Sequence, residues 1–404
     1  MFTGFELTEE QRLIQNAARE FAEKELTPEK SREYEERKEF PWELYRKACQ
    51  QGFLSLHIPE EYGGQGYGLL EHYICLYEIA KVDPPLADTI IVSTHFGIEL
   101  IINFGTEEQK ARWLPLLAKG EIVMASMFTE PAGGSDLTRV LDTKATKVGD
   151  KEWKINGTKT FITNGEIFKV ANVLVQTDFD AKPPYRGQTI FTIEKPSAIE
   201  TRPIHGKMGW HLSPTSEVTF NDAPATDEDI LGGLPNLNRG FYLMLNWLPI
   251  TRIKIGCLGI AAAEAALQKA IQYSKEREAF GRKIGSFQGL AHRMVDVATK
   301  VELGKSLLFR AIKILEKAQT DKSHMEEMTK LSSMVKYYGS ALSVEACDLA
   351  IDVFGGYGYI AEYDVERWFR WAKKLDIVEG TKEIQKKCYS KMLAWKRLNK
   401  ILLM

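Results

Sequence analysis

The spacing of hydrophobic residues changes twice along this chain, and this change limits the possible folds more than any other feature. Up to about residue 120, apolar residues recur at three- and four-residue steps, which is typical of amphipathic helices. From Glu121 onward the chain contains short β-branched and aromatic runs, such as IVMASMF, ANVLVQT and SEVTF, separated by turn residues. Helical spacing returns at about Phe241.

This order predicts a multi-domain α+β protein. We expect an N-terminal helical domain, a middle antiparallel β-barrel or sandwich domain and a C-terminal domain resembling a four-helix bundle, over residues 1–120, 121–236 and 237–404. No helical pattern separates the strand-like runs, which argues against a parallel βαβ sheet. Locally, Thr8 with Gln11 predicts a capping box, and Asn156-Gly157 predicts a β-hairpin turn.

The composition argues against several classes of protein. The chain has 404 residues, of which 44% are apolar and 27% are charged, and its net charge is -2. This balance lacks the basic surface that nucleic acid requires, so we predict no nucleic-acid partner. No apolar run approaches the roughly 18 residues of a membrane helix, so we predict no membrane span. The Glu-rich N-terminus does not resemble a targeting peptide, and we expect a cytoplasmic location.

The cysteines and histidines form no metal-binding pattern. The five cysteines lack paired spacing and are interpreted as free thiols, mostly buried, at Cys49, Cys75, Cys257, Cys347 and Cys388. The seven histidines form no H-x-x-x-H pair and no cluster with cysteine. We therefore predict no metal site.

The stretch GYGYIA, from Gly356 to Ala361, matches the G-x-G-x-x-A pattern of dinucleotide-binding proteins. That motif requires a strand before the glycines and a helix after them. The preceding residues instead repeat at helical spacing, so we interpret Gly355-Gly356 as the end of a helix. Glycines at such a place can still let a cofactor phosphate approach the backbone.

The stretch KLDIVEGTKEIQKK places Glu379 between an apolar run and the start of a helix. The apolar residues of this run are predicted to be buried, namely Leu375, Ile377 and Val378. An ionised carboxylate among them is costly unless it is capped, neutralised or used in a reaction. The residues alone leave two interpretations open: a reactive carboxylate, or an acid that favours a helix N-terminus electrostatically.

Six motifs resemble the acyl-coenzyme A dehydrogenase family, and together they extend over nearly the whole chain. They are IPEEYGGQG, TEPAGGSD, INGTKTFITNG, KEREAFGRKIGSFQ, FGGYGYIAEYDVERWFR and VEGTKEIQ. Each motif alone is a weak signal, but their shared order is specific.

The resemblance implies a helical domain, a β-domain and a four-helix C-terminal domain, in agreement with the order inferred above. It also implies non-covalently bound FAD and a homotetramer in which a neighbouring subunit reaches each flavin. The implied reaction oxidises an acyl-CoA thioester to the 2-enoyl-CoA, and an electron-transferring flavoprotein accepts the electrons.

The resemblance assigns the reaction to a few residues. Glu379 matches the general base that removes the α-proton while a β-hydride leaves for flavin N5. Arg252 matches an arginine that positions this carboxylate; without the resemblance it is a solvated arginine at a helix start. Thr251 stands where other branches of the family place the base, and threonine cannot usefully accept that proton. The expected substrate contacts are Ser135, Arg252, Val378 and Gly380.

The resemblance also assigns residues to the flavin. The expected contacts within one subunit are Thr129, Gly134, Ser135, Phe161, Thr163 and Thr381. Further contacts are expected from the second subunit and from the glycine pair, at Arg277, Phe280, Gln288, Gly355 and Gly356. Backbone N–H groups in a Gly-rich turn form a nest for anions, and an arginine can pair with phosphate. Without the resemblance these residues are ordinary β-formers and surface charges.

Some residues depart from the family pattern. Asp352 replaces a Gln near the adenine-side phosphate and is unfavourable there unless it is turned away or paired. Trp371 follows Arg370 in place of an Asp. Val378 is smaller than the Tyr that precedes the base in many straight-chain enzymes, which leaves room for a branched or cyclic acyl group.

The sequence does not choose among acyl groups, electron acceptors or reaction directions. The alternatives on the same fold are an acyl-CoA oxidase and an enoyl-CoA reductase. A flavin-containing DNA-binding protein is a further alternative, with KKCYSKMLAWKRLNK as its basic segment, but a net charge of -2 is unfavourable for binding phosphates.

Overall fold

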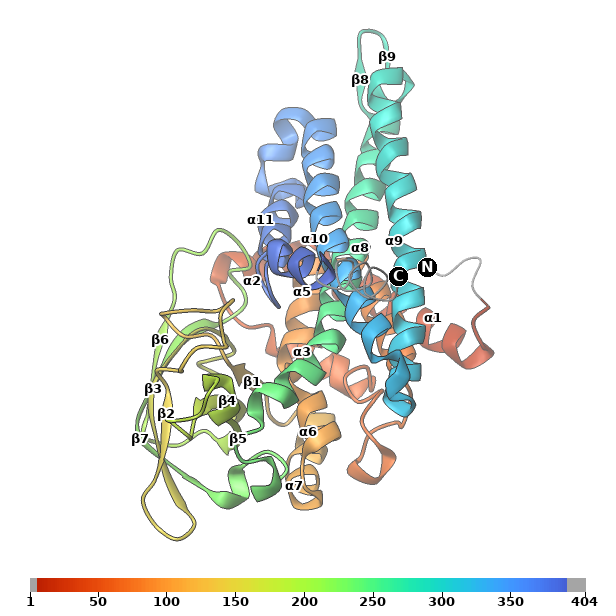
Figure 1. Cartoon of the computed structure of the whole chain (residues 1–404). Helices are drawn as coiled ribbons and strands as arrows, with labels where there is room; N and C mark the ends of the chain where they lie inside the picture. Colours follow the sequence, from red (N-terminus) through yellow and green to blue (C-terminus); the bar gives the residue numbers. More distant parts are fainter. Residues whose placement is uncertain (1–5, 391–404) are drawn as a thin grey trace, which may run out of the picture.

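The computed structural model describes residues 6–390 and confirms the predicted order of helical, β and helical segments. Figure 1 shows the strands gathered on one side of the molecule and the long helices on the other. The first segment contains α1 (Glu9–Glu25), α2 (Pro28–Arg37), α3 (Trp42–Gln50), α4 (Leu69–Ala80), α5 (Pro84–Ala87), α6 (Ile98–Phe104) and α7 (Glu107–Ala118). The predicted capping box between Thr8 and Gln11 is confirmed at the start of α1.

The middle segment forms one seven-stranded sheet within the described residues. Its strands are β1 (Met124–Met127), β2 (Lys144–Lys147), β3 (Glu152–Thr163), β4 (Val170–Gln176), β5 (Gln188–Glu194), β6 (Ile199–Pro203) and β7 (Thr215–Thr226). The order is β1-β4-β2-β3-β7-β6, and β5 pairs with β4. The antiparallel prediction is correct for most pairs but wrong for β1–β4 and β2–β4, which are parallel.

The predicted hairpin at Asn156-Gly157 is wrong, because β3 continues straight through these residues. The register with β7 shifts between Ile155 and Gly157, so the pair marks a bulge. Gly157 has a φ of 136°, and a Cβ there would lie 2.5 Å from the Cα of Thr143. The dipeptide that favours a two-residue turn thus lies within a strand, where Thr143 approaches Gly157 closely. The connection between β2 and β3 lies instead at residues 148–151.

The last segment is built from long helices. They are α8 (Gly240–Glu276), α9 (Gln288–Thr320), α10 (Met325–Phe354) and α11 (Val365–Leu375), and a further helix begins at Lys382 and is described up to Ser390. A short hairpin of β8 (Glu278–Ala279) and β9 (Arg282–Lys283) joins α8 to α9 at one tip of the molecule (Figure 1). Most of the basic segment after Lys386 lies outside the described residues.

The interpretation of the GYGYIA stretch is confirmed. The element before it is the helix α10, which ends at Gly355 with a φ of 60°. The required strand is absent at this place, so the glycines do not form a dinucleotide fingerprint.

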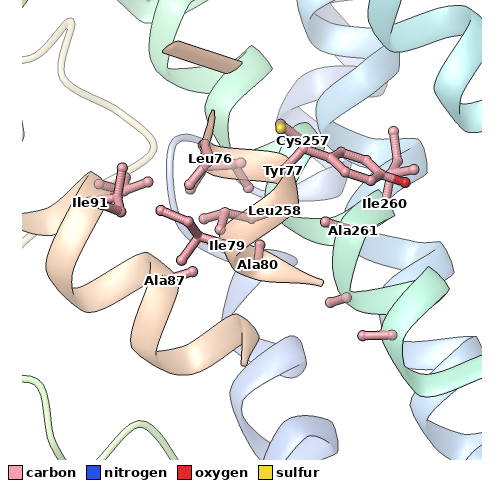
Figure 2. Close-up of a cluster of buried hydrophobic side chains, with 14 of the residues drawn as sticks. Leu76, Tyr77, Ile79, Ala80, Ala87, Ile91, Cys257, Leu258, Ile260 and Ala261 are labelled. Carbon is pink, nitrogen blue, oxygen red and sulfur yellow. The ribbon is translucent and has the colours of Figure 1, made fainter. Parts of the chain in front are cut away.

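The main core lies where the N-terminal helices meet α8. Eleven of the twelve residues of α4 are buried, because this helix is covered on all sides by α1, α5 and α8. Figure 2 shows Leu76 and Ile79 of α4 beside Ala87 of α5 and Leu258 of α8. The hydroxyl of Tyr73 donates to the carbonyl of Ile250 over 2.9 Å, which ties α4 to α8 near the middle of the molecule.

One helical stretch, Pro84–Phe104, is long and apolar enough to cross a membrane, contrary to the expectation from the sequence. Short helical pieces follow one another here, including a π-helical turn, η2 (Asp88–Val92). The helical geometry breaks at Phe96, which is extended, and at Gly97, which has a φ of 100°. Of the apolar 18-residue window in this stretch, 89% is buried inside the protein, as for the core helix of a globular protein.

All five cysteines are free thiols, as predicted, and only Cys388 is partly exposed. Among residues 6–390 no three His, Cys, Asp or Glu side chains come together in a group that could hold a metal ion.

Helices α8 and α10 pack more extensively than any other pair, and they cross through glycines. A Cβ built on Gly339 would lie 2.5 Å from the carbonyl oxygen of Gly256, and one on Gly259 would lie 2.4 Å from that of Gly339. These approaches are shorter than real Cβ contacts and involve backbone on both sides. The crossing therefore requires glycine at these positions.

We expect Gly339→Ala to destabilise the protein. Alanine is better than glycine in a helix by about 1 kcal/mol, but the clash with backbone costs typically 1–3 kcal/mol and decides the sign. The control is Gly289→Ala in α9, where nothing lies within 4 Å of the added Cβ. Thermal unfolding of the two variants should show a lower midpoint for the first and an unchanged or higher one for the second. Equal midpoints would contradict the close crossing.

Candidate active site

A cavity of about 460 Å³ lies between the β-sheet, α8 and the turn that follows α11. It gathers most of the residues predicted for the flavin and the base: Thr129, Gly134, Ser135, Phe161, Thr163, Val378, Glu379, Gly380 and Thr381. These residues come from three segments that are far apart in sequence. The apolar side chains of Val92, Phe96 and Ile255 complete part of the wall.

The turn after α11 places Glu379 in this cavity. Glu379 has a φ of 56°, which is uncommon for a residue other than glycine, and Gly380 has a φ of 88°. A Cβ on Gly380 would lie 2.7 Å from Nε2 of Gln385, and the φ of 88° would strain any residue other than glycine there. Thr381 then begins the next helix, and its hydroxyl accepts from the backbone N–H of Ile384 over 3.3 Å.

Three side chains hold the two backbone carbonyls of this turn. Nε of Arg252 donates to the carbonyl of Glu379 over 3.4 Å, and Nε2 of Gln385 donates to the same oxygen over 2.9 Å. Nζ of Lys336 donates to the carbonyl of Gly380 over 2.8 Å. Because the donors come from α8, α10 and the last helix, the unusual backbone of Glu379 is held from three directions.

Burial raises the pKa of Glu379 to about 7. The positive charges of Arg252, Lys336 and Lys374 act in the opposite direction and stabilise the ionised form. Desolvation is the larger effect, so the carboxyl group can gain and lose a proton near neutral pH. This is the property that a general base needs.

Thr251 lies beside this carboxyl group. Its hydroxyl has no hydrogen bond of normal geometry within the described residues, so the charges of Arg252 and Lys336 act more strongly than Thr251 on the pKa of Glu379. That Thr251 stands where other branches of the family carry the base stays a prediction.

Sequence reasoning missed Lys336. This lysine is fully buried in α10, and desolvation lowers its pKa to about 8. The signal was a lysine on the apolar face of a helix, in SSMVKYYGSA. Such a residue is rare unless its charge has a partner, and here it acts on the turn that carries Glu379.

The turn in TEPAGGSD is held by a buried ion pair. Glu130 accepts from Nζ of Lys159 over 2.9 Å and from the backbone N–H of Thr143 over 2.9 Å. These partners lower the pKa of Glu130 against the effect of its burial. The following residues of the turn, including Gly134 and Ser135, are thereby fixed at the cavity edge.

Phe161 reaches the cavity because β3 contains a second bulge. The register with β7 shifts between Lys159 and Ile162, and Phe161 has a φ of 56°. Its ring is 67% exposed, which is high for a phenylalanine on a strand. The bulge turns the ring away from the sheet and toward the open side of the cavity.

A second hollow of about 390 Å³ contains Arg277, Gly355 and Gly356. The guanidinium of Arg277 lies 5.8 Å from the centre of the Tyr357 ring. Nothing lies within 4 Å of a Cβ built on either glycine, so the backbone here is open. One copy of the chain therefore divides the predicted cofactor contacts between two separate hollows.

Phe280 and Gln288 line neither hollow. Phe280 stands at the turn of the β8–β9 hairpin with a φ of 52° and is 95% exposed. Gln288 is exposed at the start of α9. Phe280 therefore presents its apolar ring to solvent at the tip of the hairpin in the single chain.

Other residues near the site differ from the sequence expectations. Ile377 is 61% exposed rather than buried, because the turn directs it to the open cavity, whereas Leu375 is buried. Asp352 is paired: Nη2 of Arg293 donates to its Oδ2 over 2.7 Å. Trp371 is fully buried and donates from Nε1 to Oδ2 of Asp88 over 2.9 Å.

Three models of the acyl-CoA dehydrogenase domains match this chain in order. The N-terminal domain matches residues 8–121, the middle domain residues 125–223 and the C-terminal domain residues 238–393. The chain belongs to the acyl-CoA dehydrogenase family.

Relatives with known names are similar over almost their whole length. The caffeyl-CoA reductase-Etf complex subunit CarC of Acetobacterium woodii is 35% identical over 389 residues, or 96% of this chain and 98% of that protein. The short-chain specific acyl-CoA dehydrogenase of Clostridium acetobutylicum is 34% identical, over 95% and 97% of the two chains. The structure of butyryl-CoA dehydrogenase from Megasphaera elsdenii is 30% identical, covers 96% of this chain and 99% of its own, and has a TM-score of 0.88.

Members of the acyl-CoA dehydrogenase family are FAD-dependent oxidoreductases, and this chain is an enzyme of that class. The cavity fits a flavin in its chemistry. Phe161 and Ile377 present exposed apolar side chains that a flat ring system would cover, and Gly134 is exposed at the cavity edge. Covering these side chains would remove apolar surface from water.

We expect Glu379→Gln to be more stable than the wild type above pH 7 but not at pH 5. A carboxyl group whose pKa is raised on folding favours the folded state while it is protonated and opposes folding once it ionises. The wild type therefore loses stability between its ordinary pKa and about 7, and the amide does not. Melting temperatures across pH 5 to 8.5, measured on both proteins, test this. Glu383→Gln, in an exposed side chain nearby, is the control and should show no such divergence.

Proposed function

We propose that the enzyme catalyses the α,β-dehydrogenation of an acyl-CoA thioester to the 2-enoyl-CoA, with Glu379 as the base that removes the α-proton. The observation that carries this proposal is the position of Glu379: a carboxyl group with a pKa of about 7, in a turn that faces the cavity. A thioester lowers the pKa of its α-carbon, and a base matched to neutral pH can then take the proton.

The surrounding residues have distinct tasks in this proposal. The cations Arg252, Lys336 and Lys374 keep a fraction of Glu379 ionised in spite of its burial. Arg252 and Lys336 also hold the carbonyls of the turn, so the carboxyl group keeps one orientation. Val378 and Gly380 flank the base and, with Ser135 on the opposite wall, would contact the thioester and its CoA arm.

The flavin residues follow the division seen in the structure. Thr129, Phe161 and Thr163 would hold the ring system of FAD in the main cavity, and Gly134, Ser135 and Thr381 would meet its edge and phosphates. When bound, FAD supplies the acceptor for the hydride that leaves the β-carbon. A flat acceptor against one wall and a carboxylate on the other would hold the two reacting carbons between them.

A homotetramer explains why the remaining cofactor residues lie elsewhere. Arg277, Gly355 and Gly356 line the second hollow, and Phe280 and Gln288 are exposed near the projecting hairpin. In the proposed assembly these residues approach the flavin of a neighbouring subunit. The three-domain boundaries and the cytoplasmic location expected from the sequence likewise stay predictions.

The electron acceptor is proposed to be an electron-transferring flavoprotein. The support is that CarC of Acetobacterium woodii is named as a subunit of a reductase-Etf complex. Because this relative is named a reductase, reduction of an enoyl-CoA is the second candidate function. Because the half-reaction is reversible, a 2-enoyl-CoA should reoxidise the reduced holoenzyme to some extent in either case. Steady-state rates in the two directions, acyl-CoA with oxidised Etf against 2-enoyl-CoA with reduced Etf, distinguish the two functions, since a reductase should be faster in the second.

We expect Glu379→Gln to lose the reaction while keeping FAD. An amide cannot accept the proton, and a positioned base contributes about 10²- to 10⁴-fold in rate. Anaerobic bleaching of the flavin by acyl-CoA thioesters should therefore slow by at least about 100-fold, with an unchanged flavin spectrum before mixing. Glu383→Gln should bleach at the wild-type rate, and a Glu379→Gln variant that did the same would exclude Glu379 as the base.

The rate of bleaching should rise with pH through about 7, because only ionised Glu379 is the base. Lys336→Met removes a neighbouring positive charge that lowers the pKa of Glu379, so the midpoint should move to higher pH. Lys300→Met, in a surface lysine that pairs with Glu345, should leave the midpoint unchanged. An equal midpoint in all three proteins would contradict the assignment of this titration to Glu379.

A further inference from the structure

The wall of the main cavity contains an ion pair whose anionic member, Asp88, has no task in the proposed chemistry. Asp88, at the start of η2, and Lys374, in the last turn of α11, line the same cavity as Glu379, together with Trp210. Asp88 is only 1% exposed. The neighbouring cavity residues of this segment include the apolar Val92 and Phe96, so the pair adds charged groups beside apolar side chains.

The pair is incompletely bonded by the protein. Oδ2 of Asp88 contacts Nζ of Lys374 and accepts from Nε1 of Trp371 over 2.9 Å, whereas Oδ1 has no hydrogen-bond partner among residues 6–390. Nζ of Lys374 lies 3.0 Å from the centre of the Trp210 ring, and Asp88 is its only anionic partner within the same residues. One acceptor and the remaining N–H groups of the lysine are thus left for another group.

Such an arrangement is expensive unless something else binds to it. A buried ion pair gains little over apolar side chains of the same size, because both charges lose their hydration. The unused acceptor and donors line the cavity, so a ligand in the cavity can bond to them in place of water. Desolvation also lowers the pKa of Lys374. Connecting α11 to η2 needs only an apolar contact, so structural support alone does not account for both charges.

We infer that the acyl group of the substrate carries a hydroxyl group that donates to Oδ1 of Asp88 and accepts from Nζ of Lys374. This inference rests on the proposed acyl-CoA chemistry. A hydroxyl is favoured because it is donor and acceptor at once. A carboxylate would meet the charge of Asp88, and an alkyl end would cover the pair without bonding to it.

The first test compares matched thioesters on the wild-type holoenzyme. The probes are butyryl-, hexanoyl- and octanoyl-CoA, their ω-hydroxy counterparts, adipoyl-CoA, and 3-phenylpropanoyl-CoA with its 4-hydroxyphenyl counterpart. Anaerobic flavin bleaching gives kcat/KM for each. Hydrogen bonds to charged groups predict that at least one hydroxylated member exceeds its matched alkyl or phenyl member by about 10- to 100-fold. Ratios near one throughout, or a preference for adipoyl-CoA, overturn the inference.

The second test removes the pair. The double variant Asp88→Leu with Lys374→Met leaves no unpaired buried charge and should reverse the preference, so that the alkyl or phenyl member becomes the better substrate. The control is Lys373→Met, the same substitution at the adjacent residue, whose side chain is 47% exposed and pairs with Asp376. It should keep the wild-type ratio. A double variant that keeps FAD and retains the wild-type ratio overturns the inference. If the double variant loses FAD, the first test decides, and a ratio near one in the wild type overturns the inference.

The two levels of proposal fail differently. If no thioester in the series bleaches the flavin, the proposed dehydrogenation is wrong and the inference is overturned with it. If alkyl and hydroxylated members bleach the flavin equally, the dehydrogenation stands and only the role of Asp88 and Lys374 is wrong.

Discussion

The close crossing of α8 and α10 is the constraint on which the site depends. Gly256 and Gly339 let the two backbones meet, and the charged residues of the site lie within one turn of them. Arg252 is one turn before Gly256, and Lys336 is three residues before Gly339. Because the helices approach so closely, both side chains reach the carbonyls of a single turn. A wider crossing would separate these two donors and release the strained backbone of Glu379.

Two opposed effects set the pKa values in the site: burial disfavours charged groups, and opposite charges nearby favour them. Burial disfavours the charge of Glu379 and raises its pKa, and it also lowers the pKa of Lys336. Each group then supports the charged form of the other, because desolvation strengthens their attraction. The protein thus keeps a carboxyl group poised near neutrality through burial and neighbouring cations. The backbone of the turn fixes where that proton is exchanged.

Much of this organisation could be predicted from local pattern. Helical and strand periodicity predicted the order of the segments, and the helix before Gly355 excluded a dinucleotide motif. The failures are also physical. Asn156-Gly157 favours a turn when nothing else competes, but pairing with β7 on both sides of it stabilises a continuous strand. Ile377 was expected in the core, yet the turn that presents Glu379 also turns this residue outward. Neither outcome is visible within a short window of sequence.

The sequence by itself determined which elements form and which reactive residue types the chain carries. Those properties depend on the spacing of apolar residues along the chain and on helix or strand propensity, and both can be read directly from the sequence. Only the tertiary structure decided that Glu379 meets Lys336, that Asp88 pairs with Lys374, and that Arg277 faces a different hollow from Phe161. The proton affinity of a side chain and its ion pairing depend on distance and burial in three dimensions. Residues that are far apart in the sequence come close enough to interact only after the helices have packed.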